Sequence, residues 1–302
     1  MNITVRRITI VLGLVLGLSG TTVAHAQPSG WQPFVSISPV WDGDADLDGG
    51  GDFDVMRVLL RAGITGDLGN GNRAGLTLNY DHNDYSFSNP AAFGGVAPWG
   101  TVQRYGVAVP LLFALQDGWS LGVTPSADWF RENGADTGES LVWGGVVAVS
   151  RHFANGNRLG LGIAVFDQIE ETSVLPIFLI DWRLSERWRL INPLPSGPTG
   201  PAGLELDYEF GNGWTLGLGA AFRKMRFRLS EDGPVANGVG EEVGIPIFLR
   251  ASRSFGQQLS LDFYAGVVTG GHLRLENASG QYVREEDYDP VPLLGITFIG
   301  RF

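Results

Sequence analysis

The sequence predicts an all-β protein, a closed antiparallel transmembrane β-barrel of about fourteen strands. Three observations predict it: an export signal at the N-terminus, a strict alternation of short turns and long loops, and a last strand that ends on an aromatic residue. After the N-terminus, no stretch is apolar for anything like 18 residues, so a helical membrane protein is not expected.

The N-terminus has the three parts of a cleavable secretory signal. Arg6 and Arg7 precede an apolar run from Ile8 to Leu18, and Ala24-His25-Ala26 supplies a small-residue cleavage site. We therefore expect residues 1–26 to be removed and residues 27–302 to form a single outer-membrane barrel. The mature chain is acidic and has no cysteine. Removing Arg6 and Arg7 with the signal changes the formal net charge from −11 to −13. Such an acidic product is a poor candidate for nucleic-acid binding. Without cysteine it has neither disulfides nor thiol chemistry.

The body of the chain consists of segments with period-2 alternation of apolar and polar residues. Short turns such as Gln116-Asp117-Gly118 and Gly211-Asn212-Gly213 suit tight hairpins, and long loops alternate with them. The expected long loops are residues 41–52, 86–100, 131–140, 195–202, 229–242 and 270–288. The expected strands are 31–40, 53–66, 73–85, 101–115, 119–130, 141–153, 158–169, 174–184, 188–194, 203–210, 214–228, 243–254, 259–269 and 289–302. Segment 188–194 is the weakest, and dropping it with a neighbour would leave twelve strands.

Each expected strand has one apolar face and one polar or small face, as a division between lipid and lumen requires. Trp119, Trp188 and Trp214 each lie beside a short turn, where an aromatic girdle belongs. An exported β-sandwich also has alternating strands, but it would not need long loops at one rim. The barrel is therefore the favoured interpretation.

The last strand places Leu294, Ile296, Phe298 and Phe302 on one face, with Gly300 as a gap. This strand resembles the C-terminal signature of Gram-negative outer-membrane proteins, in which the assembly machinery reads the terminal phenylalanine. The resemblance makes Phe298 and Phe302 the expected assembly signal. Over nearly the whole mature chain, the sequence resembles uncharacterised Gram-negative outer-membrane β-barrel families. This resemblance implies outer-membrane localisation, with membrane lipid, lipopolysaccharide and the assembly machinery as partners. It identifies no substrate.

The expected lumen carries many charges, because an arginine that faces lipid at mid-depth costs roughly 2–4 kcal/mol. These side chains either line water as a charged pore wall that sorts small solutes or pair with each other in a closed interior. The expected lumen-lining residues are Arg57, Arg61, Asn79, Asp81, Arg104, Asp128, Asp181, Arg183, Glu205, Asp207, Glu209, Arg223, Asp262 and Arg301.

The first long loop contains Asp44, Asp46, Asp48 and Gly49, which match the opening of a calcium-binding loop. The twelfth position is Val55, so the closing bidentate glutamate is missing. No cofactor is expected, and a loosely bound divalent cation or a solvated acidic loop accounts for these aspartates.

Histidine after the signal occurs only at His82, His152 and His272. His82, with Asp81, Asp84, Ser86 and Ser88 nearby, is the best cluster for hydrolysis, but its spacing resembles no known barrel hydrolase. We therefore expect a pore for small solutes rather than an enzyme. The alternative is a non-conducting surface barrel whose acidic long loops bind ions, lipopolysaccharide or partners.

Four apolar-proline-apolar triplets recur near strand starts, at Pro110, Pro176, Pro246 and Pro292. Proline removes a backbone donor and is confined to strand starts, edges or bulges. The sequence leaves two interpretations open: kinks that set the register, or bulges that re-aim lumen side chains.

Overall fold

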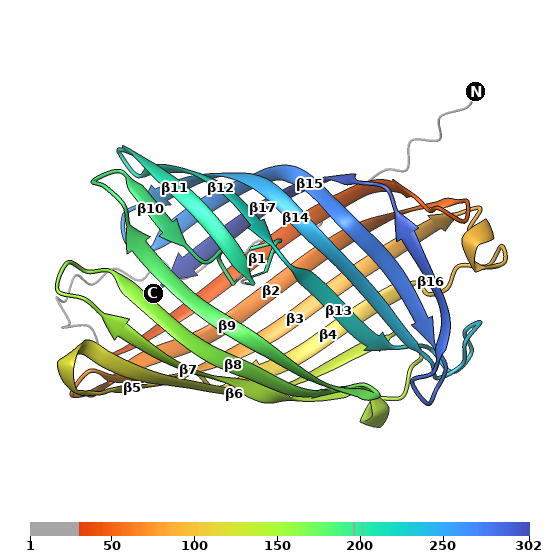
Figure 1. Ribbon diagram of the computed structural model, residues 1–302, viewed down its shortest axis with the longest axis horizontal. Coiled ribbons are helices and arrows are strands. Elements are labelled where there is room, and N and C mark those ends of the chain that lie inside the picture. The colour runs from red at the N-terminus through yellow and green to blue at the C-terminus, as the bar shows by residue number, and fades with distance from the viewer. Residues whose placement is uncertain (1–29, 196, 201) are drawn as a thin grey trace, which may run out of the picture.

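The alternating segments form one antiparallel sheet that closes on itself (Figure 1). The structure is a computed structural model that describes residues 30–195, 197–200 and 202–302. The expected signal, residues 1–26, lies outside the described residues. Seventeen strand segments form the sheet, and three pairs of them are single strands with a short interruption, which gives the predicted fourteen wall strands.

The wall strands, in chain order, are β1 (Trp31–Asp46), β2 (Asp52–Gly69), β3 (Asn72–Ser88), β4 with β5 (Thr101–Ala108 and Leu111–Ala114), β6 (Trp119–Glu132), β7 (Leu141–His152), β8 (Arg158–Gln168), β9 (Glu171–Arg183), β10 (Trp188–Ile191), β11 (Gly203–Gly211), β12 with β13 (Trp214–Ala221 and Arg223–Arg228), β14 (Val239–Phe255), β15 (Leu259–Glu276), and β16 with β17 (Tyr282–Tyr288 and Val291–Arg301). Three short 3₁₀ segments, η1 (Ala91–Phe93), η2 (Gln116–Gly118) and η3 (Gly138–Ser140), lie in connections. Within the described ranges, no helix is long and apolar enough to span a membrane.

The barrel closes where the last strand pairs with the first. β17 runs antiparallel to β1, from the pair Phe34 and Arg301 to the pair Asp42 and Leu293. This closure pairs the edges of the first and last strands with each other, as the sequence predicted. The ring of Phe302 lies against Gly300, so it fills the gap in the apolar face of the last strand.

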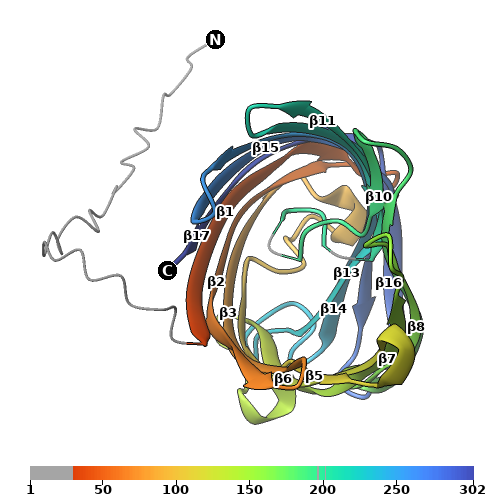
Figure 2. The same ribbon diagram turned by 90° about the vertical axis from the view of Figure 1, so that its left-hand side faces the viewer.

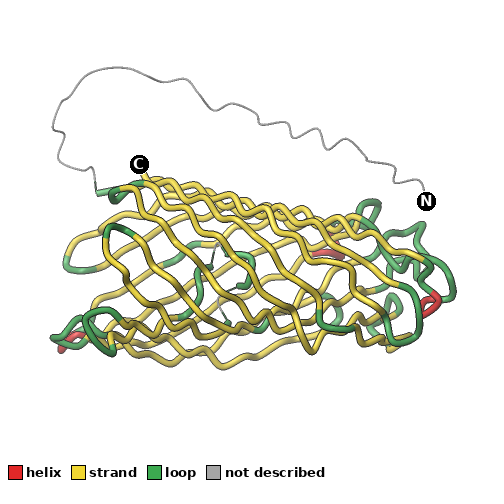
Figure 3. The backbone as a smooth tube through the Cα atoms, turned by 90° about the horizontal axis from the view of Figure 1, so that it is seen from above, coloured by secondary structure: helices red, strands yellow, loops and turns green. Residues whose placement is uncertain are grey.

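Short turns and long loops gather at opposite rims of the barrel (Figure 3). At the short-turn rim, Asn70-Gly71 and Asn212-Gly213 take positive φ angles of 55°, 77°, 51° and 77°, which tight hairpins require. The outer face carries exposed apolar residues such as Leu161, Leu218 and Phe263 along its length.

The strands at the long-loop rim extend further than the sequence predicted. β1 continues to Asp46, β14 begins at Val239, and β15 and β16 occupy most of residues 270–288. On β14, Glu241 and Glu242 follow each other, and on β16 residues 284–287 are all charged, so the alternation that identified the strands is lost there. The expected loops 41–52, 229–242 and 270–288 are correspondingly shorter.

The connection between β10 and β11 folds into the barrel instead of standing at the rim (Figure 2). We call its described residues, 192–195, 197–200 and 202, the inward segment. A side chain at Gly197 would touch the hydroxyl of Tyr264 on β15, and one at Gly295 on β17 would touch Pro198. The segment therefore crosses to strands that are not its neighbours in the wall. Its prolines cannot continue a strand ladder.

The recurrent prolines lie where the sheet is interrupted or irregular. Pro110 lies between β4 and β5, and Pro292 follows the interruption between β16 and β17. Pro246 directly follows Ile245, at the end of the register shift that begins at Val243. Three of the four triplets thus mark irregularities of the wall, and the fourth, at Pro176, lies on β9.

Candidate functional site: the barrel interior

The inward residues of β2 change character from one rim to the other. From the long-loop rim they are Phe53 and Val55, then Arg57, Leu59 and Arg61, then Gly63 and Thr65. Apolar residues thus give way to two arginines around one leucine, and then to small residues. The interior has the same three zones: an aromatic core, a layer of ion pairs, and a vestibule at the short-turn rim.

The aromatic core fills the long-loop end between opposite walls. Trp99, from the connection between β3 and β4, meets Phe227 of β13 with ring centroids 5.2 Å apart. The same ring lies edge-on to Tyr85 and Phe87, at 5.8 Å from each, and Phe93 packs beside it. A single bridge between Arg228 and Arg131 joins β13 to β6 across the same end. The axial route is therefore filled with packed side chains at this level.

Below the aromatic core lies a central network of Asp42, Arg57, Tyr85, Arg223 and Glu242. Arg57 donates to Asp42 at 2.9 Å and to both oxygens of Glu242, at 2.6 and 2.8 Å. Arg223 donates to Asp42 at 2.8 Å, and the hydroxyl of Tyr85 also donates to Glu242. Two guanidinium groups thus balance two carboxylates, and the network ties β1 and β2 to β13 and β14.

A second group of ion pairs lies on β2, β3, β4 and β6. Arg61 pairs with Asp81, and Arg104 donates to Asp128 at 2.7 Å and to Asp81 at 3.3 Å. Gly106 makes this possible, because a Cβ there would collide with the carboxylate of Asp128. These charges are also balanced.

The third group, the Arg250 cluster, is not balanced. Arg250 donates to Glu205 at 2.6 Å, to Asp207 at 2.9 Å and to Asp262 at 3.0 Å. All four side chains are buried. The carboxylates of Glu205 and Asp207 have room because Gly217, the partner of Asp207 on β12, has no side chain. Three carboxylates therefore share one guanidinium group.

The vestibule is a cavity of about 610 Å³ at the short-turn rim. Four arginines line it, Arg61, Arg73, Arg104 and Arg301, together with Asn79, and no carboxylate is among its described lining residues. Arg73 and Arg301 have no ion pair in the described part of the chain, whereas Arg61 and Arg104 are paired. The cavity is therefore cationic although the whole protein is acidic.

The remaining expected lumen residues lie near the short-turn rim. Asp181 accepts two bonds from Arg189, at 2.7 and 2.8 Å. Arg183 and Glu209 have no side-chain ion pair among the described residues. Sequence reasoning missed Asp42, Glu242 and Arg250. Arg250 shares a strand face with Phe248 and Ser252, so extending the face assignment to residues 243–254 would have found it.

The expected calcium ligands do not form a loop site. Asp44 and Asp46 belong to β1, and only Asp48 lies in the short connection to β2. In the described ranges, no group of three or more His, Asp or Glu residues is arranged to hold a metal ion. The extended strand explains the difference, because it spreads alternate carboxylates along one face instead of curling them around an ion.

The residues around His82, the best candidate for a hydrolytic cluster, are not joined by hydrogen bonds to His82 in the described structure. Asp81, buried and paired with Arg61, precedes His82 on β3, where successive side chains point to opposite faces. Asp84 accepts from Thr101 at 3.0 Å, and within the described chain His82 has no hydrogen bond to a serine or a carboxylate.

Two of three comparisons with known proteins find similar proteins. The family model described as Domain of unknown function (DUF6268) matches residues 102–279. No curated protein matches the chain. Among solved structures, the COG4313 outer membrane channel from Pseudomonas putida F1 is similar with a TM-score of 0.50 and 14% identity, over 92% of this chain and 97% of that one.

Two other barrels are similar at lower scores. The Pseudomonas putida toluene transporter TodX has a TM-score of 0.43 and 9% identity, over 91% of this chain and 90% of that one. The translocator domain of autotransporter NalP from Neisseria meningitidis has a TM-score of 0.37 and 12% identity, over 92% and 90%. The similarity to the COG4313 channel, at a TM-score of 0.50 and 14% identity, concerns the fold, an outer-membrane β-barrel.

Proposed function

Because the chain belongs to the family described as Domain of unknown function (DUF6268), whose description names no activity, we propose one from the barrel itself: an outer-membrane channel for small organic anions. The exposed apolar belt and the tryptophans beside the short turns support insertion in a bilayer. The short-turn rim faces the periplasm in this proposal, since short turns lie on that side of such barrels.

The cationic vestibule carries the proposal. A cavity of about 610 Å³ is within the size range of small-molecule sites. Its arginines create a positive potential in a space with low-dielectric walls, which concentrates anions. Arg73 and Arg301 have no carboxylate partner within the described chain, so they are free to act on a passing solute.

The charge preference is testable by flux into proteoliposomes. We expect butanesulfonate to enter faster than a butyltrimethylammonium cation of similar size. Replacing Arg73 and Arg301 together by glutamine removes two charges worth about 1 kcal/mol each at 4 Å in water. The preference for the anion should then fall roughly 5- to 30-fold, most visibly at low ionic strength.

Arg151→Gln is the matched control, because Arg151 lies on the outer face over the ring of Trp119, at 5.6 Å. An unchanged anion preference in the double variant would contradict the role of the vestibule. Insertion without flux of either solute would favour the second candidate function, a non-conducting barrel with surface loops that bind ions, lipopolysaccharide or partners. The observation that favours this candidate is the aromatic core at the long-loop end.

The assembly machinery is proposed as a partner through Phe302. This residue is 69% exposed and follows the last residue of β17. Phe302→Ala should therefore change the stability of the folded barrel by less than about 0.5 kcal/mol, while it lowers the amount of folded protein in the outer membrane of cells. Heat-dependent migration on a detergent gel measures both. Equal loss in cells and in detergent refolding would show a structural role instead.

A further inference from the structure

Among the residues that the structure describes, strand β9 has a long edge without a strand partner. It pairs with β8 from Glu171 to Asp181, but it pairs with β10 only at Asp181, Trp182 and Arg183. On the far side of this gap, β11 begins at Gly203. β13 pairs with β14 on one edge, and in the described chain its other edge has only the single bridge at Arg228. Figure 1 shows β1–β4 through the space between β9 and β13.

The opening is framed by side chains at both ends. Toward the short-turn rim, Asn192 accepts from the N–H of Ile180 at 2.9 Å and donates to the carbonyls of Phe178 and Gly203, both at 3.0 Å. Toward the long-loop rim, Lys224 pairs with Glu171 at 3.0 Å. We call the opening between these two closures the wall window.

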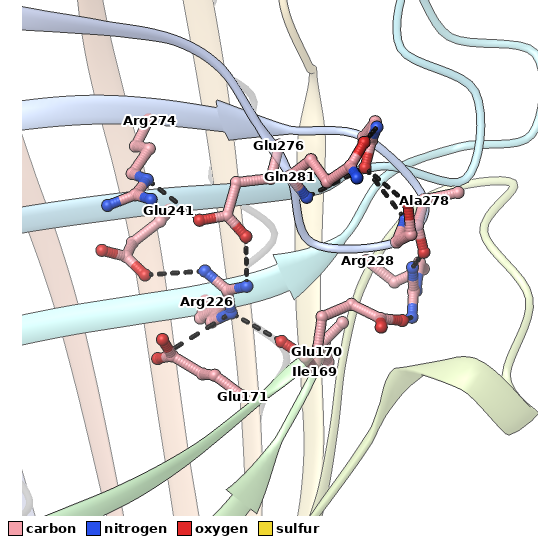
Figure 4. A network of polar contacts seen from close by, with 12 residues as sticks. Ile169, Glu170, Glu171, Arg226, Arg228, Glu241, Arg274, Glu276, Ala278 and Gln281 are labelled. Carbon is pink, nitrogen blue, oxygen red and sulfur yellow. Dashed lines mark hydrogen bonds and ion pairs between the residues drawn. The ribbon is translucent and has the colours of Figure 1, made fainter.

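At the long-loop end of the wall window, Arg226, Arg228 and their partners form a polar network (Figure 4). Arg226 donates to the carbonyl of Ile169 at 2.7 Å, and Arg228 donates to Glu170 at 2.7 Å. The tip of the β8–β9 hairpin is therefore fixed to β13 by side chains, whereas the strand edges below it stay apart.

The window lies at the depth of the apolar belt. On β8 the residues paired with Val174, Pro176 and Phe178 are Val165, Ile163 and Leu161, all exposed on the outer face. Unpaired backbone at this depth is tolerated only where it is buried in protein or lines a water-filled cavity. Pro176 belongs to this edge and has no N–H to leave unpaired, which gives the fourth proline triplet a physical reason.

A cavity of about 650 Å³ lies behind the window. Its lining includes Ile177 and Leu179 of β9, Val146 of β7, and Leu194 and Pro195 of the inward segment. Leu194 and Pro195 also line the vestibule, so the inward segment borders both cavities. Arg158 lines the window cavity too, and its buried Nε has no hydrogen-bond partner.

We propose that the wall window is a lateral portal, through which small amphipathic anions pass between the lipid and the vestibule. An apolar tail fits the belt and the Ile177–Leu179 wall, and a carboxylate or sulfonate head fits Arg158 and the vestibule arginines. This inference rests on the proposed function, because it names the route and the class of solute for the same channel. The filled axial route at the aromatic core leaves the window as the way in.

The test uses the absence of natural cysteines. The first variant is Ile177→Cys, because Ile177 lines the window cavity. Its matched control is Ile163→Cys, because Ile163 pairs with Pro176 and lies exposed on the outer face. Each variant is labelled with fluorescein maleimide in proteoliposomes, and octanesulfonate influx is compared with that of the same unlabelled variant. Labelling at residue 177 should reduce influx at least about tenfold, since the label fills a cavity of ligand size. Labelling at residue 163 should leave it unchanged.

Tail length gives an independent measurement. A portal from lipid favours octanesulfonate over ethanesulfonate, and an aqueous axial pore reverses that order. Full influx after labelling at residue 177, with the anion preference of the channel intact, would overturn the portal and leave the channel standing. No influx in any unlabelled protein would overturn the proposed function itself. Unlabelled Ile177→Cys must show the heat-dependent gel migration of the parent protein, which shows that the variant folds.

Discussion

Arg250→Leu destabilises the barrel by about 3–5 kcal/mol, the range for removing one partner of a buried ion pair. The guanidinium group of Arg250 is the shared donor to Glu205, Asp207 and Asp262, so its loss leaves three buried carboxylates without their counter-charge. Equilibrium unfolding of the refolded barrel by urea in detergent measures the change. Among the described ion-pair groups this one has the largest excess of a single charge, so the effect is expected to exceed that of Arg61→Leu.

Arg183→Leu is the control, because Arg183 is exposed and makes no side-chain ion pair in the described structure. Adding Glu205→Gln and Asp207→Asn to Arg250→Leu should recover part of the lost free energy, since neutral amides carry no charge that needs a partner. A stability of Arg250→Leu equal to that of the parent protein would mean that water already solvates these carboxylates.

Strand number and closure followed from the sequence because they depend on local patterns. Each spanning segment alternates, and Asn-Gly and Asp-Gly mark the short turns, so residues 119–130 or 259–269 could be recognised without their neighbours. Alternation fails at the long-loop rim, where Glu241 and Glu276 lie on one face with Arg226 and bind it (Figure 4). These parts of the strands lie outside the apolar belt, so their polar sequence predicted loops instead of strands.

The pairing of the charges did not follow from the sequence. The alternation of residues identified Arg57 as inward. Its partner Glu242 is 185 residues away, and it lies just before the predicted start of the strand at residue 243. The inward segment shows the same limit, because prolines and glycines indicate a loop and not the side to which the loop folds. The predicted charged lumen residues stand as candidates for solute contact mainly at the vestibule, where Arg301 has no described ion-pair partner.

Trp99→Ala should open the axial route and also destabilise the protein. The indole ring meets Phe227 from the opposite wall and contacts Tyr85 and Phe87, and it is almost completely buried. Removing a buried tryptophan side chain costs about 3–5 kcal/mol because of lost transfer free energy and the cavity that remains. In this barrel that cavity lies between the packed long-loop end and the ion-pair layer.

Trp99→Ala is expected to increase both the conductance and the solute influx. Single-channel recordings should show a higher conductance for Trp99→Ala than for the parent protein, and ethanesulfonate influx into proteoliposomes should rise. In the background of labelled Ile177→Cys, Trp99→Ala should restore influx by the axial route, because the lost ring no longer bridges the two walls. Leu161→Ala, an exposed position on the lipid side, should leave conductance unchanged. Equal conductance in Trp99→Ala and the parent protein, with both folded by gel mobility, would mean that the ring does not close the long-loop end.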